Sequence, residues 1–293
     1  MAQQAAPARG QAAPADREFP AVDINKFLDI SAQVEVDDLD WELCARQGLT
    51  ADEIFLIGYM SNIENHTIIY MREMLATTAA LESEVVAFLS MWNYEEFFHG
   101  RALARVLEVC GQPLAESSIR DVRKKTGLRE RVEGVFSSIL SVVYRNDYPA
   151  LYMTWGAINE FSATQAYEQL AATTSNQPLA ILCRRIAKQE RRHFAWYFNG
   201  ARERLARSPR GQRMTRAIMT RFFTPVGAGV KPVHEVDRAM RLTFPGTAGL
   251  EVGAAADARI GALPGMSGVD LLTKFVKRAQ ATGAGTRPAP AAA

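Results

Sequence analysis

Apolar positions recur with the spacing of a helix over most of the chain, without the convincing alternation that predicts strands. The pattern predicts four long helices, at about residues 50–80, 84–110, 149–174 and 179–205. Thr50 and Glu53 form a capping box at the start of the first, and Pro149 suits the first turn of the third. Shorter helices are expected at residues 211–223, 233–242 and 270–278, with one or two more within 21–49.

A long segment at residues 114–146 connects the second predicted helix to the third. Two helices, a long connection and two further helices are the layout of a ferritin-like bundle with one crossover. We therefore predict an all-α fold, a ferritin-like four-helix bundle with a long crossover and additional helices. The expected divisions are a disordered tail at residues 1–20, the bundle with flanking helices at 21–223, an extension with short helices at 224–280 and a disordered tail at 281–293.

The composition is that of a globular chain with one sizeable core. Of the 293 residues, 48% are hydrophobic and 23% are charged, and the net charge is +2. These values predict a soluble protein without a transmembrane segment, and the first residues do not resemble a secretory signal. Cys44, Cys110 and Cys183 are far apart and odd in number, which argues against a disulfide framework and against a cysteine-based zinc site. We expect a reducing, cytoplasmic compartment.

Two short motifs place metal-ligating side chains within the apolar helices. Glu96 and His99 stand three residues apart in the second predicted helix, and Glu190 and His193 repeat this step in the fourth. Residues three apart share one face of a helix, so each step presents a carboxylate and an imidazole together. A single step of this kind is commonly solvent exposed, whereas two in separate helix pairs predict a pair of metal ions.

The partner helices carry carboxylates at the matching levels. Glu96 follows the turn near residue 81 by about 15 residues, and the same distance back along the preceding helix falls near Glu64. An equivalent projection from Glu190 reaches about residue 162, where Glu160 is the nearest acid. Four carboxylates at one depth of an apolar bundle would repel each other unless cations compensated their charge. The predicted ligands, which suit two iron ions, are Glu64, Glu96, His99, Glu160, Glu190 and His193.

Other polar residues near the motifs have more ordinary expected roles. Glu95 lies about 100° round the helix from Glu96, so we expect it beside the site or at the surface. Trp92 shares the face of Glu96, where core packing is its ordinary role. His66 and His234 are expected to be packing or surface residues.

The two motifs resemble those of the soluble acyl carrier protein desaturases, a family of ferritin-like di-iron proteins. Residues 92–100 match the family's Trp-x-x-Glu-Glu-x-x-His-Gly, and residues 190–197 match its Glu-x-Arg-His followed four residues later by Tyr. The resemblance covers roughly residues 50–206. The chain departs from the family pattern at Phe97 and Phe98, which replace Asn-Arg, and at Gln189, which replaces an Asp expected to orient a ligand histidine.

This resemblance implies that the six ligands named above bind two ferrous ions as the catalytic centre. It further implies oxygen-dependent desaturation of an acyl chain carried on acyl carrier protein, an external electron donor such as ferredoxin, and a homodimer. Residues 184–221 hold twelve Lys and Arg against two Glu, which suits docking of an acidic carrier protein, although a solvated helix face is the simpler interpretation. No recognition fold for nucleic acid accompanies this charge.

Several alternative functions share the predicted centre. A di-iron hydroxylase or N-oxygenase acting on another carrier-bound or small-molecule substrate is the main one. An iron-storage or peroxide-scavenging protein is another. A ribonucleotide reductase radical subunit would need a tyrosyl site, for which Tyr94 and Tyr167 are the candidates.

Overall fold

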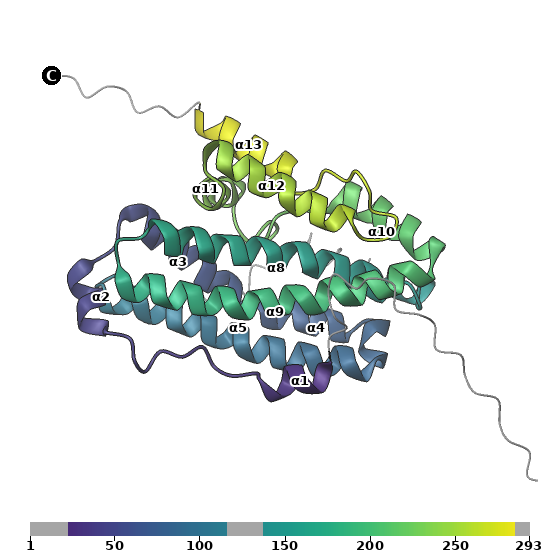
Figure 1. Ribbon diagram of the computed structural model, residues 1–293, viewed down its shortest axis with the longest axis horizontal. Helices are drawn as coiled ribbons and strands as arrows, with labels where there is room; N and C mark the ends of the chain where they lie inside the picture. Colours follow the sequence, from purple (N-terminus) through teal and green to yellow (C-terminus); the bar gives the residue numbers. More distant parts are fainter. Residues whose placement is uncertain (1–22, 116–136, 285–293) are drawn as a thin grey trace, which may run out of the picture.

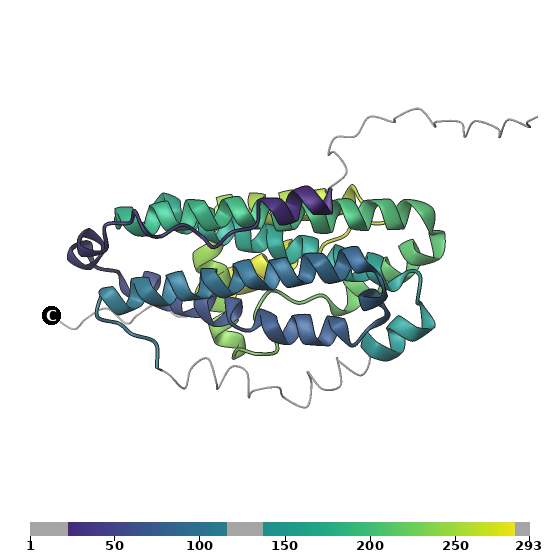
Figure 2. The same ribbon diagram turned by 90° about the horizontal axis from the view of Figure 1, so that it is seen from below.

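The computed structural model describes residues 23–115 and 137–284, and these are helical almost throughout (Figure 1). Four helical rods lie side by side in both views (Figures 1 and 2). The rods are α3 (Ala51–Glu64) continued by α4 (Thr67–Leu75), then α5 (Ser83–Val109), α8 (Tyr148–Thr173) and α9 (Gln177–Arg207). No strand occurs within the described ranges. The predicted all-α four-helix bundle is therefore confirmed.

Three of the four rods start where the sequence supplies a helix-starting signal, namely α3, α8 and α9. Thr50 accepts a hydrogen bond from the Glu53 backbone N–H at 3.2 Å, and the Glu53 carboxylate accepts one from the Thr50 N–H at 2.7 Å, which completes the predicted capping box. At the start of α9, Asn176 accepts from the Leu179 N–H at 3.1 Å. Prolines in the first turns of α8 and α9 need no N–H partner there.

The first rod is not the single helix to residue 80 that we predicted. It breaks at Asn65 and His66, and a 3-10 turn, η1 (Thr78–Leu81), follows α4. Side chains compete for the helix carbonyls at the break, because Asn65 Nδ2 donates to Ser61 O at 2.8 Å and Thr67 Oγ1 donates to Glu64 O at 2.6 Å. As a result, Glu64 is the last residue of α3.

Gly100 lets α5 pass close to this break. Ser61 Oγ donates to Gly100 O at 2.9 Å, and a Cβ at position 100 would lie 2.5 Å from Asn65 Nδ2 and 3.2 Å from Glu64 Cβ.

We expect Gly100→Ala to displace α3, to lower the free energy of unfolding by about 1–3 kcal/mol and to weaken metal binding at Glu64. Urea unfolding and metal titration measure the two effects. Gly58→Ala is the control, since its Cβ would meet nothing nearer than 3.6 Å, and equal losses in both variants would contradict this account.

An extended strap at residues 30–40 joins α1 (Ile24–Asp29) to α2 (Trp41–Gln47) and contacts both α5 and α9 (Figure 1). Arg185 of α9 holds it with two bonds of 2.6 Å to Asp38 and one of 2.8 Å to Glu35 O. At the end of the bundle, Asn176 Nδ2 donates to Cys44 O at 2.9 Å and so fixes α2. The tail expected at residues 1–20 lies outside the described residues.

The C-terminal extension packs against α8, on the side of the bundle opposite the strap (Figure 1). Helix α10 (Pro209–Phe222) precedes the extension and contacts α8 and α9, and the extension itself holds α11 (Val233–Thr243), α12 (Gly246–Gly261) and α13 (Thr273–Ala284). We expected no helix at the position of α12, and α13 runs past residue 281, where we expected disorder to begin. Ile260 and Leu272 share one apolar cluster with Phe88 and Tyr197, so the extension and the bundle have a common core.

Parts of two further predictions fall outside the described ranges. Of the connection at residues 114–146, residues 137–143 are helical and residues 116–136 are not described. Residues 285–293, most of the expected C-terminal tail, are likewise not described. Among residues 23–115 and 137–284, the helices do not combine the length with the apolar character that a membrane span requires.

Candidate metal centre

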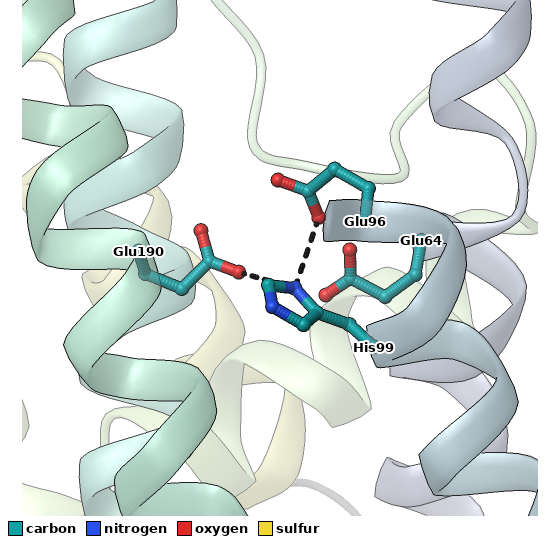
Figure 3. A group of neighbouring side chains, drawn as sticks. All are labelled: Glu64, Glu96, His99 and Glu190. Atoms are coloured by element: carbon teal, nitrogen blue, oxygen red, sulfur yellow. Dashed lines mark ion pairs between the residues drawn. The ribbon is translucent and has the colours of Figure 1, made fainter. Parts of the chain in front are cut away.

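The structure brings all six predicted ligands together inside the bundle, and none of them is more than 6% exposed. They form two groups, within each of which the ligand atoms lie within 4.8 Å of one another. The groups are Glu64, Glu96, His99 and Glu190, shown in Figure 3, and Glu96, Glu160, Glu190 and His193. Each group can hold a metal ion. Glu96 and Glu190 belong to both groups, which makes them the candidates for bridging carboxylates.

The six residues form a polar layer between two apolar clusters of the bundle. On α5, Trp92 belongs to one cluster and Ala102 to the other, with Glu96 and His99 between them. On α9, Ala187 and Trp196 flank the second motif in the same way. Apolar packing above and below the layer therefore excludes bulk water from the site, and electrostatic interactions within it are strong.

Both imidazoles turn Nδ1 toward the carboxylates. His99 Nδ1 lies 3.1 Å from Glu190 Oε1 and 3.4 Å from Glu96 Oε2 (Figure 3). His193 Nδ1 lies 3.2 Å from Glu96 Oε1 and 3.2 Å from Glu190 Oε2, with Glu160 Oε2 at 3.8 Å. Nδ1 is therefore the candidate ligand atom of both histidines.

Buried atoms at the centre of the first group are poorly satisfied by the protein itself. Within the described residues, His99 Nδ1 and Glu190 Oε1 make no well-aligned hydrogen bond, and they face each other at 3.1 Å as an ion pair. Buried polar atoms of native proteins nearly always have hydrogen-bond partners. A cation bound between these two atoms would satisfy both, and a set of carboxylate oxygens with imidazole nitrogens suits a first-row divalent metal such as iron.

In the metal-free cluster, the pKa values of several ligand side chains are raised, so these side chains hold protons that reduce the net negative charge. Burial and the nearby charge of Glu96 raise the pKa of the Glu64 carboxyl well above its usual value, and burial also raises the pKa of Glu160. Burial opposes the charging of His99, but Glu190 and Glu96 outweigh it and raise the pKa of His99 to about 10. The pKa of His193 is raised as well, by its four glutamate neighbours against the effect of burial. Protons thus occupy positions that metal ions would take.

Two aromatic side chains hold the carboxylates that belong to only one group. Trp92 Nε1 donates to Glu160 Oε1 at 3.1 Å, and the Tyr167 hydroxyl donates to Glu64 Oε1. Burial raises the pKa of Tyr167 well above its usual value, so the hydroxyl keeps the proton that it donates. Trp92 therefore does more than the core packing that we expected of it. Tyr94, the other tyrosine considered, is 45% exposed and bonds to Gln33 of the strap.

The Nε2 atoms of the two histidines, which face away from the four carboxylates, contact different side chains. His99 Nε2 lies 2.6 Å from the Gln189 amide oxygen, whereas His193 Nε2 lies 2.7 Å from the Glu95 carboxylate. The Ala32 peptide of the strap contacts both supports, since its N–H donates to Glu95 at 3.2 Å and its C=O accepts from Gln189 at 2.9 Å. An imidazole that is hydrogen-bonded to a carboxylate is a stronger metal ligand than one that is hydrogen-bonded to an amide. His193 is therefore expected to bind its metal ion more tightly than His99 does.

This difference gives a prediction for Glu95→Gln, which keeps the shape of the side chain and removes its charge. We expect metal affinity of the group containing His193 to fall by about 10–100-fold, with little change at His99. Titration with cobalt(II), followed by its visible absorption, resolves the two binding steps. Glu84→Gln changes an exposed residue at the start of α5 and serves as the control. Unchanged affinity in Glu95→Gln, or an equal loss in both steps, would contradict the assigned support.

An apolar cavity of about 70 Å³ adjoins the cluster on the side of Glu64 and Tyr167. Its other walls come from α3, α8, α11 and the loop before α11, and include Ile63, Ala166 and Ala239. Pockets for drug-sized ligands are roughly 300–1,000 Å³. A bulky substrate could therefore enter here only if α11 and its loop moved outward.

About half of the basic residues in the segment 184–221 form ion pairs with acidic side chains. These pairs are Arg185 with Asp38, Arg191 with Glu168, Arg192 with Glu95, Arg204 with Glu82, Arg207 with Glu203 and Arg210 with Asp147. Arg216 donates to the carbonyl oxygen of Ser267 at 2.7 Å. Attraction toward an acidic partner is accordingly weaker than the count of basic residues indicates.

Sequence reasoning named Tyr167 only as a candidate radical site, and it missed the role of Ala32. Tyr167 lies seven residues after Glu160, a spacing that returns to the same helix face and so was a usable signal for its contact with the ligands. Ala32 acts through its backbone, which leaves no signature in the sequence. His66 and His234 match expectation, because His66 is buried with its ring edge against Tyr70 and His234 is exposed.

Comparisons of the chain with protein-family models, with curated proteins and with solved structures gave no match. The geometry of the chain therefore has to define the site. It is a buried cluster of four Glu and two His, arranged in two overlapping groups that can each hold a metal ion.

Proposed function

We propose that this protein is an oxygen-dependent di-iron oxidoreductase that desaturates an acyl chain carried on acyl carrier protein. The observation that carries the proposal is the pair of four-residue groups that share Glu96 and Glu190. Two ferrous ions bound there would supply the activation of dioxygen that removal of hydrogen from an unactivated C–H bond requires. The motifs at residues 92–100 and 190–197, which resemble those of the desaturases, support the acyl substrate.

The chain's own residues prepare this site in three ways. Glu95 and Gln189 fix the orientation of the imidazoles, so that Nδ1 of each faces the cluster. Trp92 and Tyr167 hold the outer carboxylates. The apolar clusters on both sides keep bulk water away from the six ligands, which would limit side reactions at a metal centre held there.

The remaining participants follow from the resemblance. The reaction needs two electrons, and residues 226–229, the nearest approach to a glycine-rich nucleotide loop, lack the spacing of that motif. An external donor such as ferredoxin would supply them, and a homodimer is the expected assembly. The apolar cavity beside Glu64 would receive the reacting part of the acyl chain once α11 moves outward.

The size of that cavity also favours a second candidate. A volume of about 70 Å³ accommodates a small group without rearrangement, and many arginines of the basic segment are paired within the chain. A di-iron hydroxylase or N-oxygenase acting on a smaller substrate would use the same metal centre. The two candidates differ in what happens to the substrate.

The deciding experiment is a single turnover analysed by mass. The chain is loaded with ferrous iron and mixed with acyl carrier protein bearing a long acyl chain, oxygen and a reductant. Loss of two hydrogens from the acyl chain is the expected result. Gain of one oxygen would favour the hydroxylase, and an unchanged acyl chain in a protein that holds two irons would overturn the acyl substrate while leaving the centre intact.

A further inference from the structure

Two of the three cysteines, which the sequence separates widely, meet at one end of the bundle. Cys44 lies in α2 and Cys110 caps the C-terminus of α5, and their sulfur atoms are 3.8 Å apart. Both thiols are free. The third cysteine, Cys183, is buried within α9 and takes no part in the contact between Cys44 and Cys110. We had expected no cysteine pair, because the three cysteines are far apart in the sequence. The sequence does not show that the strap and α2 bring Cys44 to the end of α5.

The two thiols differ in their surroundings. Cys44 is fully buried, whereas Cys110 is partly exposed. Burial, with the neighbouring Cys110, raises the pKa of the Cys44 thiol to about 12, so Cys44 remains protonated near neutral pH. A small reagent from solvent therefore reaches Cys110 first, and Cys44 stands in contact behind it.

We propose that Cys44 and Cys110 form a reversible disulfide bond when the protein meets hydrogen peroxide. The sulfur of Cys110 attacks one peroxide oxygen, the O–O bond breaks, and Cys110 sulfenic acid and water result. The sulfur of Cys44 then attacks the sulfur of Cys110, the S–O bond breaks, and the Cys44 proton leaves with the hydroxyl group as a second water. Two thiols are oxidised by two electrons, and one peroxide is reduced to two waters.

The short distance between the two sulfur atoms and the fixed position of α2 suit this bond. A disulfide needs its sulfur atoms about 2.05 Å apart, so the two sulfur atoms must approach by roughly 1.8 Å for the bond to form. The backbone of α2 is already held beside α9, since the Asn176 side chain donates to both Cys44 O and Gly48 O. The bond would add a covalent link from this junction to the end of α5, the helix that carries Glu96 and His99.

The link closes a long loop, because the two cysteines are 66 residues apart. A disulfide that closes a loop of this length strongly reduces the conformational entropy of the unfolded chain. We therefore expect the unfolding temperature of the oxidised protein to exceed that of the reduced protein by about 5–15 °C. This inference is independent of the proposed function, since it concerns neither the metal ligands nor the substrate.

Thiol counting and peptide mapping test the proposal on the full chain. The reduced protein is treated with hydrogen peroxide, quenched with catalase, denatured and alkylated with iodoacetamide. We expect two fewer alkylated cysteines, a mass lower by two hydrogens, a peptide that joins Cys44 to Cys110, and full reversal by dithiothreitol. Cys183→Ser should behave like the natural chain apart from its missing thiol.

Single variants separate the two steps. Cys44→Ser should accumulate the sulfenic acid at Cys110, which dimedone traps, and Cys110→Ser should react much more slowly. The proposal is overturned if Cys44 and Cys110 both stay alkylable after peroxide, if Cys110 passes directly to sulfinic acid, or if the disulfide joins two chains instead of one.

Discussion

Glu96→Ala is expected to abolish binding of both metal ions, whereas Glu160→Ala is expected to remove one. The reason is geometric, because Glu96 contributes a ligand atom to both groups and Glu160 to one. Loss of a shared carboxylate leaves each group with three of its four residues and removes the bridge between them. Iron content per chain, measured after anaerobic loading with ferrous iron and gel filtration, distinguishes the two outcomes. Turnover in the proposed reaction should disappear in both variants.

The helical fold should survive these substitutions. Alanine is the best helix former and relieves the repulsion between neighbouring carboxylates, so circular dichroism should change little. Glu84→Ala, at an exposed position in the first turn of α5, serves as the matched control and should bind as much iron as the natural chain. If Glu96→Ala kept either metal ion at full occupancy, the assignment of Glu96 as a shared ligand would be wrong.

Metal-free protein is expected to lose stability as pH rises from 7 to 9. The pKa of His99 is about 10 in the folded chain and about 6.5 in an unfolded one, so the folded state binds more protons between these values. Stability from this group is fully present below pH 6.5 and is lost as pH rises through about 10. The expected fall is about 1 kcal/mol per pH unit from His99, and the raised pKa of His193 adds a change of the same sign.

Metal loading should remove this pH dependence, because bound imidazoles carry no proton on Nδ1. Urea unfolding at pH 7, 8 and 9, with iron or with a chelator, measures the difference. His99→Gln should flatten the curve of the metal-free chain. A free energy of unfolding that stayed constant or increased with pH in the metal-free natural chain would contradict the assigned protonation.

The sequence was a reliable guide where one helix determines the outcome. Helical rise and turn positions were sufficient to choose Glu64 and Glu160 as partners of the two motifs, because rods in a hairpin keep their register. The angle of Glu95 round α5 left a place beside the site or at the surface, and the structure shows the first of these. These inferences rest on geometry that is local to a helix or to one helix pair.

Structural features that depend on packing between distant segments could not be predicted from the sequence. The break after Glu64 interrupts a continuous apolar pattern and adjoins the close approach of Gly100. Helix α12 is rich in Gly and Ala, and its contact with α13 gives it a stability that composition does not show. The Ala32 peptide and the Cys44–Cys110 contact both follow from the path of the strap, which no local pattern specifies.

The most direct test of the metal centre is a crystal structure of the chain loaded anaerobically with iron, with anomalous diffraction recorded at the iron edge. We expect two peaks, roughly 3.5–4 Å apart, with Glu96 and Glu190 bound to both ions. Glu64 and His99 should complete one coordination sphere, and Glu160 and His193 the other. A single peak within the cluster, or iron bound only elsewhere, would contradict the account.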